Sequence, residues 1–405
     1  MINAAFSATF RSVSDRVAAG LQAGLYGFGL PFESGQGATS KLGGRDVVVL
    51  TSNNYLGLAG DPRVRDSIAA ALDVYGASTC GARLHNGTTD LHVSLERELA
   101  EWLGVEAAMI YSSGFLANLG AVSALGDENT VIITDQLNHM SIVDGQTLAR
   151  AQVRIFAHND MEKLEYILQR TQDVPKRLIV TDGVFSMDGD LAPLDEIMTL
   201  GDRYDALVLV DDAHALGVIG RHGRGTGEHF GVQPDVIMGT FSKSLAGTGG
   251  YIGGTRSMID YLRHSAHSYV FNASASPALM AGVSTALELL KSEPWRRERL
   301  WRNTIRFRSA LIRSGFDVLD SVTPVVPIMI GDELTAMQMA KELLDVGVYI
   351  ALAIFPAVPQ GKGRFRATIT AALSDQQIDD AVAAITDVAR AHGLLESARP
   401  MQVVA

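Results

Sequence analysis

Gly239-Thr240-Phe241-Ser242-Lys243 is the stretch that decides the fold and the chemistry expected of this chain. The apolar run 236–238 leads into it, which predicts the end of a buried strand, a turn that carries hydroxyl groups, and one lysine. Lys243 is the only lysine between residues 177 and 290. Burial lowers the pKa of a lysine, and the neutral amine can form an imine with an aldehyde. The alternative is a lysine whose ammonium group reaches solvent at the strand end.

Short apolar runs alternate with helical patterns over the first two thirds of the chain. Strands are expected at residues 47–50, 107–111, 131–134, 153–156, 178–181, 206–210 and 236–240. Helices are expected at residues 63–75, 91–103, 115–125, 140–149, 161–170 and 194–204. Continuous apolar strands that alternate with helices are typical of a parallel sheet covered on both faces. We therefore expect an α/β fold with a large, mostly parallel sheet between helices.

The pattern changes from about residue 281 onward. One helical stretch is expected at residues 278–311, and further strands and helices follow it to residue 391. This mixture of strands and helices predicts a smaller α+β domain at the C-terminus. The N-terminal segment is expected to pack with this domain. The predicted division is an N-terminal segment (1–50), a large cofactor-binding domain (51–285) and a small domain (286–405).

Composition excludes several classes of function. The formal net charge of −11 argues against a nucleic-acid partner, which requires a basic face. The single cysteine, Cys80, leaves no disulfide and no cysteine–histidine metal cluster to build. No apolar run approaches the roughly 20 residues of a membrane span. Residues 1–30 faintly resemble an organelle presequence, but we interpret them as a helix packed on the body of a cytoplasmic protein.

Polar residues that could take part in binding or catalysis follow several of the predicted strands. Because active sites of open parallel sheets form at the carboxyl ends of the strands, these residues are expected to meet. They are, in chain order, Gly114, Phe115, His139, Ser186, Asp211, His214, Thr240, Ser242 and Lys243.

Asp211 ends an apolar strand, so its carboxylate is expected to be buried and to need a cationic partner. The protonated ring nitrogen of pyridoxal phosphate (PLP) would be such a partner. Lys243 would then bind the aldehyde, and a helix start at Gly114 would bind the phosphate. Each residue also has a plain structural interpretation, such as a helix cap or a loop histidine. The order in which they occur at successive strand ends favours the PLP site.

Three motifs carry a resemblance to a known family: residues 182–189 (DGVFSMDG), 210–214 (VDDAH) and 239–243 (GTFSK). With them, the chain from Asn53 to its last helix resembles the α-oxoamine synthases, which are fold-type-I PLP enzymes. That group includes 8-amino-7-oxononanoate synthase, 2-amino-3-ketobutyrate CoA ligase and serine palmitoyltransferase. The resemblance implies an acyltransferase that joins an amino acid to an acyl thioester, carried by CoA or by an acyl carrier protein, with loss of carbon dioxide.

The resemblance also implies how individual residues bind the cofactor. Lys243 forms the imine and later removes the α-proton of the substrate, and Asp211 pairs with the pyridine nitrogen. His139 stacks on the ring, and His214 hydrogen-bonds the ring hydroxyl. The phosphate is held by the hydroxyls of Thr240 and Ser242 and by the amides of Gly114 and Phe115.

Further implied residues bind substrate or complete the site. Ser186 lies near the ring hydroxyl and the substrate, while Asn54 and Arg366 match the positions that bind the substrate carboxylate. An arginine suits this task because its fork meets a carboxylate at two points. Family members are homodimers with a shared site, and the segment that ends at Ser274 matches the one that reaches the partner's phosphate.

Two departures and several alternatives leave the substrate open. Ala275 stands where the family often has leucine, and Met140 stands where a small residue is common. Motifs match different branches, so glycine, serine and alanine all remain candidates. The alternatives are a glycine C-acetyltransferase type of reaction without net decarboxylation, another fold-type-I lyase or aminotransferase, and a non-catalytic protein of the same fold.

Overall fold

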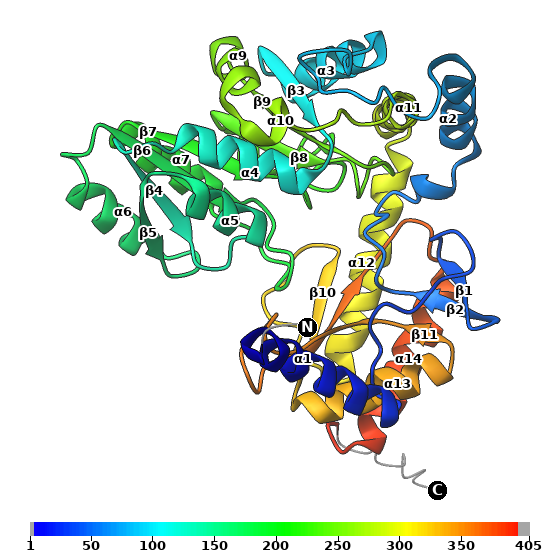
Figure 1. Ribbon diagram of the computed structural model, residues 1–405. Helices are drawn as coiled ribbons and strands as arrows, with labels where there is room; N and C mark the ends of the chain where they lie inside the picture. The colour runs from blue at the N-terminus through cyan, green and yellow to red at the C-terminus, as the bar shows by residue number, and fades with distance from the viewer. Residues whose placement is uncertain (1–3, 396–405) are drawn as a thin grey trace, which may run out of the picture.

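The computed structural model describes residues 4–395, and its largest unit is a seven-stranded sheet with helices around it (Figure 1). Across the sheet the strands are β3 (Ala107–Tyr111), β9 (Gly250–Gly254), β8 (Val236–Thr240), β7 (Ala206–Asp211), β6 (Lys176–Asp182), β4 (Thr130–Asp135) and β5 (Gln152–Phe156). Only β9 runs antiparallel to its neighbours. The expected mostly parallel sheet is therefore confirmed.

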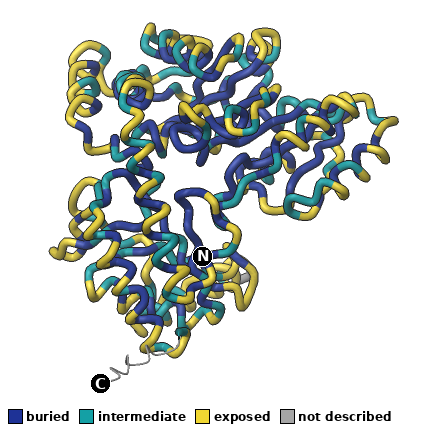
Figure 2. The backbone as a smooth tube through the Cα atoms, turned by 180° about the vertical axis from the view of Figure 1, so that it is seen from behind, coloured by how far each residue is buried: buried dark blue, intermediate teal, exposed yellow. Residues whose placement is uncertain are grey.

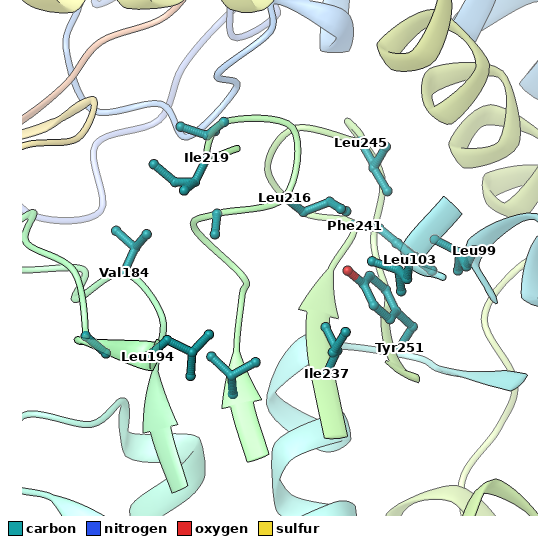
Figure 3. Close-up of a cluster of buried hydrophobic side chains, with 14 of the residues drawn as sticks. Leu99, Leu103, Val184, Leu194, Leu216, Ile219, Ile237, Phe241, Leu245 and Tyr251 are labelled. Atoms are coloured by element: carbon teal, nitrogen blue, oxygen red, sulfur yellow. The ribbon is translucent and has the colours of Figure 1, made fainter. Parts of the chain in front are cut away.

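Both faces of this sheet are buried, which explains why its strands read as continuous apolar runs. On β8, Ile237 points into one apolar core, whereas its neighbour Met238 points into the core on the opposite face. Figure 3 shows Ile237 with Phe241 and Tyr251 in the first core, where the two aromatic rings stack with centroids 5.9 Å apart. The two cores hold the strand ends, and hence Lys243, in fixed positions.

The helices that cover the sheet begin mostly at capping residues. Ser113 caps α4 and His139 caps α5, and both residues also face the candidate site. The helices of this part are α2 (Pro62–Tyr75), α3 (Asp90–Leu103), α4 (Gly114–Leu125), α5 (Met140–Leu148), α6 (Met161–Arg170), α7 (Leu194–Arg203), α8 (Thr226–Phe230), α9 (Arg256–Ser265), α10 (His267–Val270) and α11 (Pro277–Ser292). A short 3-10 helix, η1 (Leu58–Gly60), precedes α2.

The C-terminal part forms a second body with its own apolar core, as expected. One antiparallel sheet has the order β10 (Val325–Gly331), β13 (Gly363–Thr368), β12 (Ala351–Ala353), and α12 (Trp295–Arg313), α13 (Glu333–Asp345) and α14 (Asp375–Ala391) complete this body. A second sheet joins the N-terminal strands β1 (Thr39–Leu42) and β2 (Arg45–Val49) to β11 (Val348–Tyr349). The N-terminal segment thus belongs with the C-terminal body.

Two expectations about helices need correction. The single helix expected at residues 278–311 is two helices, α11 and α12, because Pro294 between them lacks an N–H and disfavours a continuous helix. Helix α1 (Ala4–Gln22) is mostly exposed rather than packed, and Phe6 and Phe10 keep 62% and 54% of their surface accessible.

The predicted domain boundaries at residues 50 and 285 stay a prediction. Figure 1 shows α12 running from the large sheet body toward the C-terminal body.

Burial along the chain follows these layers (Figure 2). The central strands are buried over most of their length and at their carboxyl ends, whereas β5, at the edge of the sheet, is mostly exposed. The carboxyl ends of β4, β6, β7 and β8 therefore lie in the protected middle of the sheet, where polar side chains are cut off from bulk water.

Candidate active site

A cavity of about 280 Å³ opens at the carboxyl ends of the central strands. Most of the residues singled out in the sequence line it: Gly114, Phe115, His139, Ser186, Asp211, His214, Thr240, Ser242 and Lys243. They come from five different loops and helix starts, so the sheet brings together residues that are distant in the chain. The predicted convergence at strand ends is what the structure shows.

Lys243 follows β8, is half-buried and lines the cavity. Burial lowers its pKa to about 7, although the negative charge of Asp211 opposes this shift. A substantial fraction of its amine is therefore neutral near pH 7, which is the form that attacks an aldehyde or accepts a proton.

Asp211 is held in place by two hydrogen bonds at the end of β7. Its Oδ1 accepts a bond of 2.8 Å from the backbone N–H of Ala213, and its Oδ2 accepts one of 2.6 Å from Nδ2 of Asn118. Only 5% of the Asp211 surface is exposed. These donors fix the carboxylate at the wall of the cavity, where it can face a cation.

Asn118, on α4, was not singled out in the sequence, and it connects two predicted site residues. Its Nδ2 also donates to Oγ of Ser141 (2.9 Å), and Ser141 Oγ lies 2.7 Å from Nδ1 of His139. A buried asparagine within an apolar helix was the signal available in the sequence, because buried amides need partners.

An anion cradle lies at the start of α4. The hydroxyls of Thr240 and Ser242 are 2.9 Å apart, and the helix start at Gly114 faces them. A side-chain Cβ at position 114 would come within 2.8 Å of Thr240 Oγ1, so only glycine allows this approach. Backbone N–H groups at a helix N-terminus favour a bound anion such as phosphate.

The pKa values of both site histidines are lowered. Burial is the first cause in each case, and the positive charge of Lys243 acts in the same direction, whereas the charge of Asp211 opposes the shift at His139. Nδ1 of His139 accepts a hydrogen bond from the N–H of Ser141, and Nδ1 of His214 lies 2.7 Å from the hydroxyl of Tyr55. Neutral imidazoles can face an aromatic ring or share a proton without adding charge to the cavity.

Asp182, at the end of β6, also lines the cavity and was not among the predicted site residues. Burial, and next the charge of Asp211, raise its pKa well above the usual range for a carboxyl group. Its Oδ1 accepts a hydrogen bond of 3.3 Å from the N–H of His139. Of the two acids, Asp211 has the shorter hydrogen bonds, at 2.6 and 2.8 Å.

Arg366 reaches toward the cavity from β13 of the C-terminal body. Its Nε donates to the backbone oxygen of Ser186, and its two terminal nitrogens lie 3.4 and 3.5 Å from Oδ1 of Asn53. Burial lowers the pKa of the guanidinium. A buried arginine fork beside a polar cavity is suited to bind a carboxylate.

Asn54, also expected to bind the carboxylate, has other partners in this structure, and its role stays a prediction. Its Nδ2 donates to the backbone oxygen of Gln36 (3.2 Å), and its Oδ1 accepts from the N–H of Ala59 (3.1 Å). The side chain is thus committed to the fold of the loop. Asn53 is the asparagine that faces Arg366.

Ser274 lies outside the cavity within this single chain. Its N–H donates to the backbone oxygen of Gly81 (2.9 Å), and its hydroxyl is 2.8 Å from that of Thr79. The contact expected for Ser274 is with the cofactor of a partner subunit, and it stays a prediction.

The residues of the cavity fit PLP. Lys243 would provide the amine, Asp211 would face the ring nitrogen, and the cradle at Gly114 would bind the phosphate. Among the described residues 4–395, no group of histidine, cysteine and acidic side chains is arranged to hold a metal ion.

Comparison with known proteins gives the same result independently. The family model for aminotransferase class I and II matches residues 45–385. The chain belongs to this family. It is 43% identical to an 8-amino-7-oxononanoate synthase from Symbiobacterium thermophilum, over 92% of this chain and 96% of that protein. It is also 43% identical to a serine palmitoyltransferase from Sphingobacterium spiritivorum, over 89% of this chain and 90% of that protein.

Solved structures are similar as well. A serine palmitoyltransferase with its PLP internal aldimine superimposes with a TM-score of 0.93 at 32% identity, over 96% of this chain and 99% of that one. An 8-amino-7-oxononanoate synthase from Francisella tularensis shares the fold, with a TM-score of 0.73 at 24% identity, over 86% of this chain and 99% of that one.

The chain is therefore a PLP-dependent α-oxoamine synthase of fold type I, which condenses an amino acid with an acyl thioester and releases carbon dioxide. The family, fold class, enzyme class and cofactor expected from the sequence are confirmed. Within residues 4–395 no helix is long and apolar enough to cross a membrane.

Proposed function

We propose that Lys243 and Asp211 carry the chemistry of this enzyme and that Arg366 orients the amino acid. Bound PLP supplies an aldehyde for covalent attachment and an electron sink for the bond that breaks at Cα. The observation that carries the proposal is that Lys243, with its pKa lowered to about 7, lines the same cavity as the anchored carboxylate of Asp211. Its neutral Nζ can take the α-proton of the substrate at neutral pH.

The other cavity residues hold the cofactor in register with Lys243. Asp211, anchored by its two donors, would pair with the protonated ring nitrogen of bound PLP. His139 would contact the ring of PLP, and His214 and Ser186 would contact its hydroxyl. The phosphate is bound at the start of α4 by Gly114, Phe115, Thr240 and Ser242.

Arg366 and Asn53 bind the carboxylate of the amino acid. Arg366 stands on the C-terminal body, whereas Lys243 stands on the large sheet. The carboxylate must be able to turn relative to Lys243, because the Cα–H bond breaks before acyl transfer and the bond to the carboxylate breaks after it.

The relatives' names indicate different substrates, since one names serine and a palmitoyl group and another names 8-amino-7-oxononanoate. We propose a small amino acid, namely glycine, alanine or serine, and an acyl thioester of CoA or of an acyl carrier protein. The test is to load the protein with PLP and follow its absorption spectrum during titration with each amino acid. Each productive amino acid is then combined with acyl-CoAs of increasing chain length and with acyl carrier proteins. A protein that produces no carbon dioxide with any pair would contradict the proposal.

We further propose a homodimer in which the segment Phe271–Ser274 completes the partner's site. Phe271, at its start, keeps 81% of its surface exposed in the single chain, as expected for a residue that a partner covers. Mixing Lys243→Ala with Ser274→Trp protein should restore activity if the site is shared, because one of the two sites in a heterodimer then carries neither defect. Full activity in a monomer would contradict a shared site. The cytoplasmic location expected from the sequence stays a prediction.

A further inference from the structure

Residues 183–192 form a closed hairpin that carries Ser186 near its tip. Val184 and Leu191 pair across it, and the N–H of Phe185 donates to the backbone oxygen of Asp190 (3.1 Å). The N–H of Ala192 closes the base by donating to the oxygen of Gly183 (3.1 Å). The position of Ser186 in the cavity therefore depends on how this hairpin as a whole is held.

The large sheet body holds the middle of the hairpin through His158, which follows β5. Nδ1 of His158 lies 3.1 and 3.2 Å from the two oxygens of Asp135, at the end of β4. Nε2 lies 2.7 Å from Oδ2 of Asp190, on the hairpin. The imidazole also packs edge to face against Phe185, with centroids 4.3 Å apart and planes at 86°. One side chain thus connects the sheet to both strands of the hairpin.

Both ring nitrogens of His158 face carboxylate oxygens, and a neutral imidazole has only one N–H to donate. The arrangement therefore requires the protonated form. Burial by itself would lower the pKa of His158, but the hydrogen bonds to Asp135 and Asp190 outweigh it and raise the pKa to about 10. Asn159 supports the same contacts by donating to Asp190 Oδ2 (3.1 Å) and to the backbone oxygen of Leu191 (3.1 Å).

The C-terminal body holds the tip of the same hairpin. Arg364 on β13 forms an ion pair of 2.5 Å with Asp188, and two positions along the strand Arg366 donates to the oxygen of Ser186. The oxygen of Gly189 accepts from the N–H of Val322 (3.0 Å). Gly189 has a φ of +73°, and a Cβ there would lie 2.1 Å from the backbone oxygen of Val325. The tip is therefore fitted closely against the small body.

We infer that His158 is a positioning residue for the amino-acid site, because it fixes to the sheet the hairpin against which Ser186 and Arg366 are aligned. The inference rests on the proposed role of Arg366 in binding the substrate carboxylate. His158 itself does not line the cavity. Its effect is transmitted by Asp190 and Phe185 to the hairpin tip, and from there to the guanidinium of Arg366.

The test uses the full-length protein loaded with PLP and the variants His158→Gln and Asp190→Asn. His222→Gln is the matched control, because His222 is also paired with a carboxylate, Glu228, but lies outside the hairpin. Hydrogen exchange of residues 183–192 is measured in each protein, together with KM for the amino acid and KM for the acyl-CoA. Retention of PLP is followed by absorbance.

We expect both hairpin variants to retain PLP and to exchange amide hydrogens of residues 183–192 about 10-fold faster, while β7 and β8 exchange as before. KM for the amino acid should rise about 10-fold, and KM for acyl-CoA should change less than about 2-fold, because only Arg366 loses its alignment. If His158→Gln does not fold, the result for Asp190→Asn decides whether His158 positions the hairpin. This variant removes one charge and leaves the imidazole in place.

Unchanged exchange in residues 183–192, or an equal rise of both KM values, would overturn the role of His158. The control His222→Gln should behave as the wild type, and the same effect there would also overturn it. If the wild-type protein releases no carbon dioxide from any amino acid, the proposed function fails. The exchange measurement still decides separately whether His158 holds the hairpin.

Discussion

Asn118 donates a hydrogen bond of 2.6 Å to Asp211 at the buried end of β7. Asn118 belongs to α4, whose start forms the anion cradle, so a single helix both orients the acid for the ring nitrogen and faces the phosphate site. Its second bond, to Ser141, extends the connection to His139. The positions of the acid, the histidine and the phosphate site are therefore set by one rigid element.

The first prediction concerns Asp211→Asn. The amide retains the shape of the side chain but cannot hold a proton on the ring nitrogen. We expect the variant to bind PLP and to lose about 3 kcal/mol of transition-state stabilisation, which is a fall in kcat of at least ~100-fold. Steady-state kinetics and the bound-PLP spectrum check this result. Turnover close to that of the wild type would show that another group supports the ring nitrogen.

Removal of the Arg366 fork should act on the amino acid alone. We expect Arg366→Ala to raise KM for the amino acid by about 30-fold, corresponding to loss of a charge-assisted bond of about 2 kcal/mol. Arg366→Lys should recover only part of this loss, because one ammonium group cannot form the two-point contact. Spectral titration with the amino acid, before any thioester is added, measures the effect. Unaltered affinity in Arg366→Ala would rule out this role.

The adjacent asparagines offer a matched pair of variants. Asn53→Ala should weaken amino-acid binding with little change in stability, because Asn53 faces Arg366. Asn54→Ala should lower the free energy of unfolding by about 1–3 kcal/mol, because its loss leaves the partners at Gln36 and Ala59 unpaired. Urea unfolding and amino-acid titration of both variants separate the two roles. If only Asn54→Ala lost affinity for the amino acid, Asn54 rather than Asn53 would be the residue that binds the substrate.

The buried amine of Lys243 predicts a pH dependence of stability in the PLP-free protein. Its pKa falls from 10.5 to about 7 on folding, so folding disfavours the charged form. The resulting loss of stability is absent above pH 10.5, grows as pH falls, and is complete below about pH 7. Lys243→Met should therefore be more stable than the wild type at pH 7, and the difference should shrink as pH rises toward 10. A difference that does not vary with pH would contradict the shifted pKa.

Much of the fold could be predicted from local patterns. The apolar run before Lys243 and its counterparts elsewhere predicted a buried parallel sheet, because a strand covered on both faces has no polar side. The strand ends then predicted which residues line the cavity. The division at Pro294 could also have been predicted from the sequence, since proline interrupts helices.

What local patterns could not supply is the direction of single side chains. Asn53 and Asn54 are identical in type and adjacent, and only the tertiary contacts of the loop decide which one faces Arg366. The position of His158 between Asp135 and Asp190 depends on three loops that are distant in the chain. Such pairings arise from the packing of the sheet, and no spacing in the sequence marks them.

The most direct test of the central claim follows the carboxyl carbon of the substrate. The PLP-loaded protein is given a carboxyl-labelled amino acid and an acyl-CoA, and released label and free thiol are measured together. We predict one labelled carbon dioxide for each thiol, and neither product from Lys243→Ala. Release of thiol while the label stays in the product would contradict a decarboxylating condensation and would instead support the acetyltransferase type of reaction.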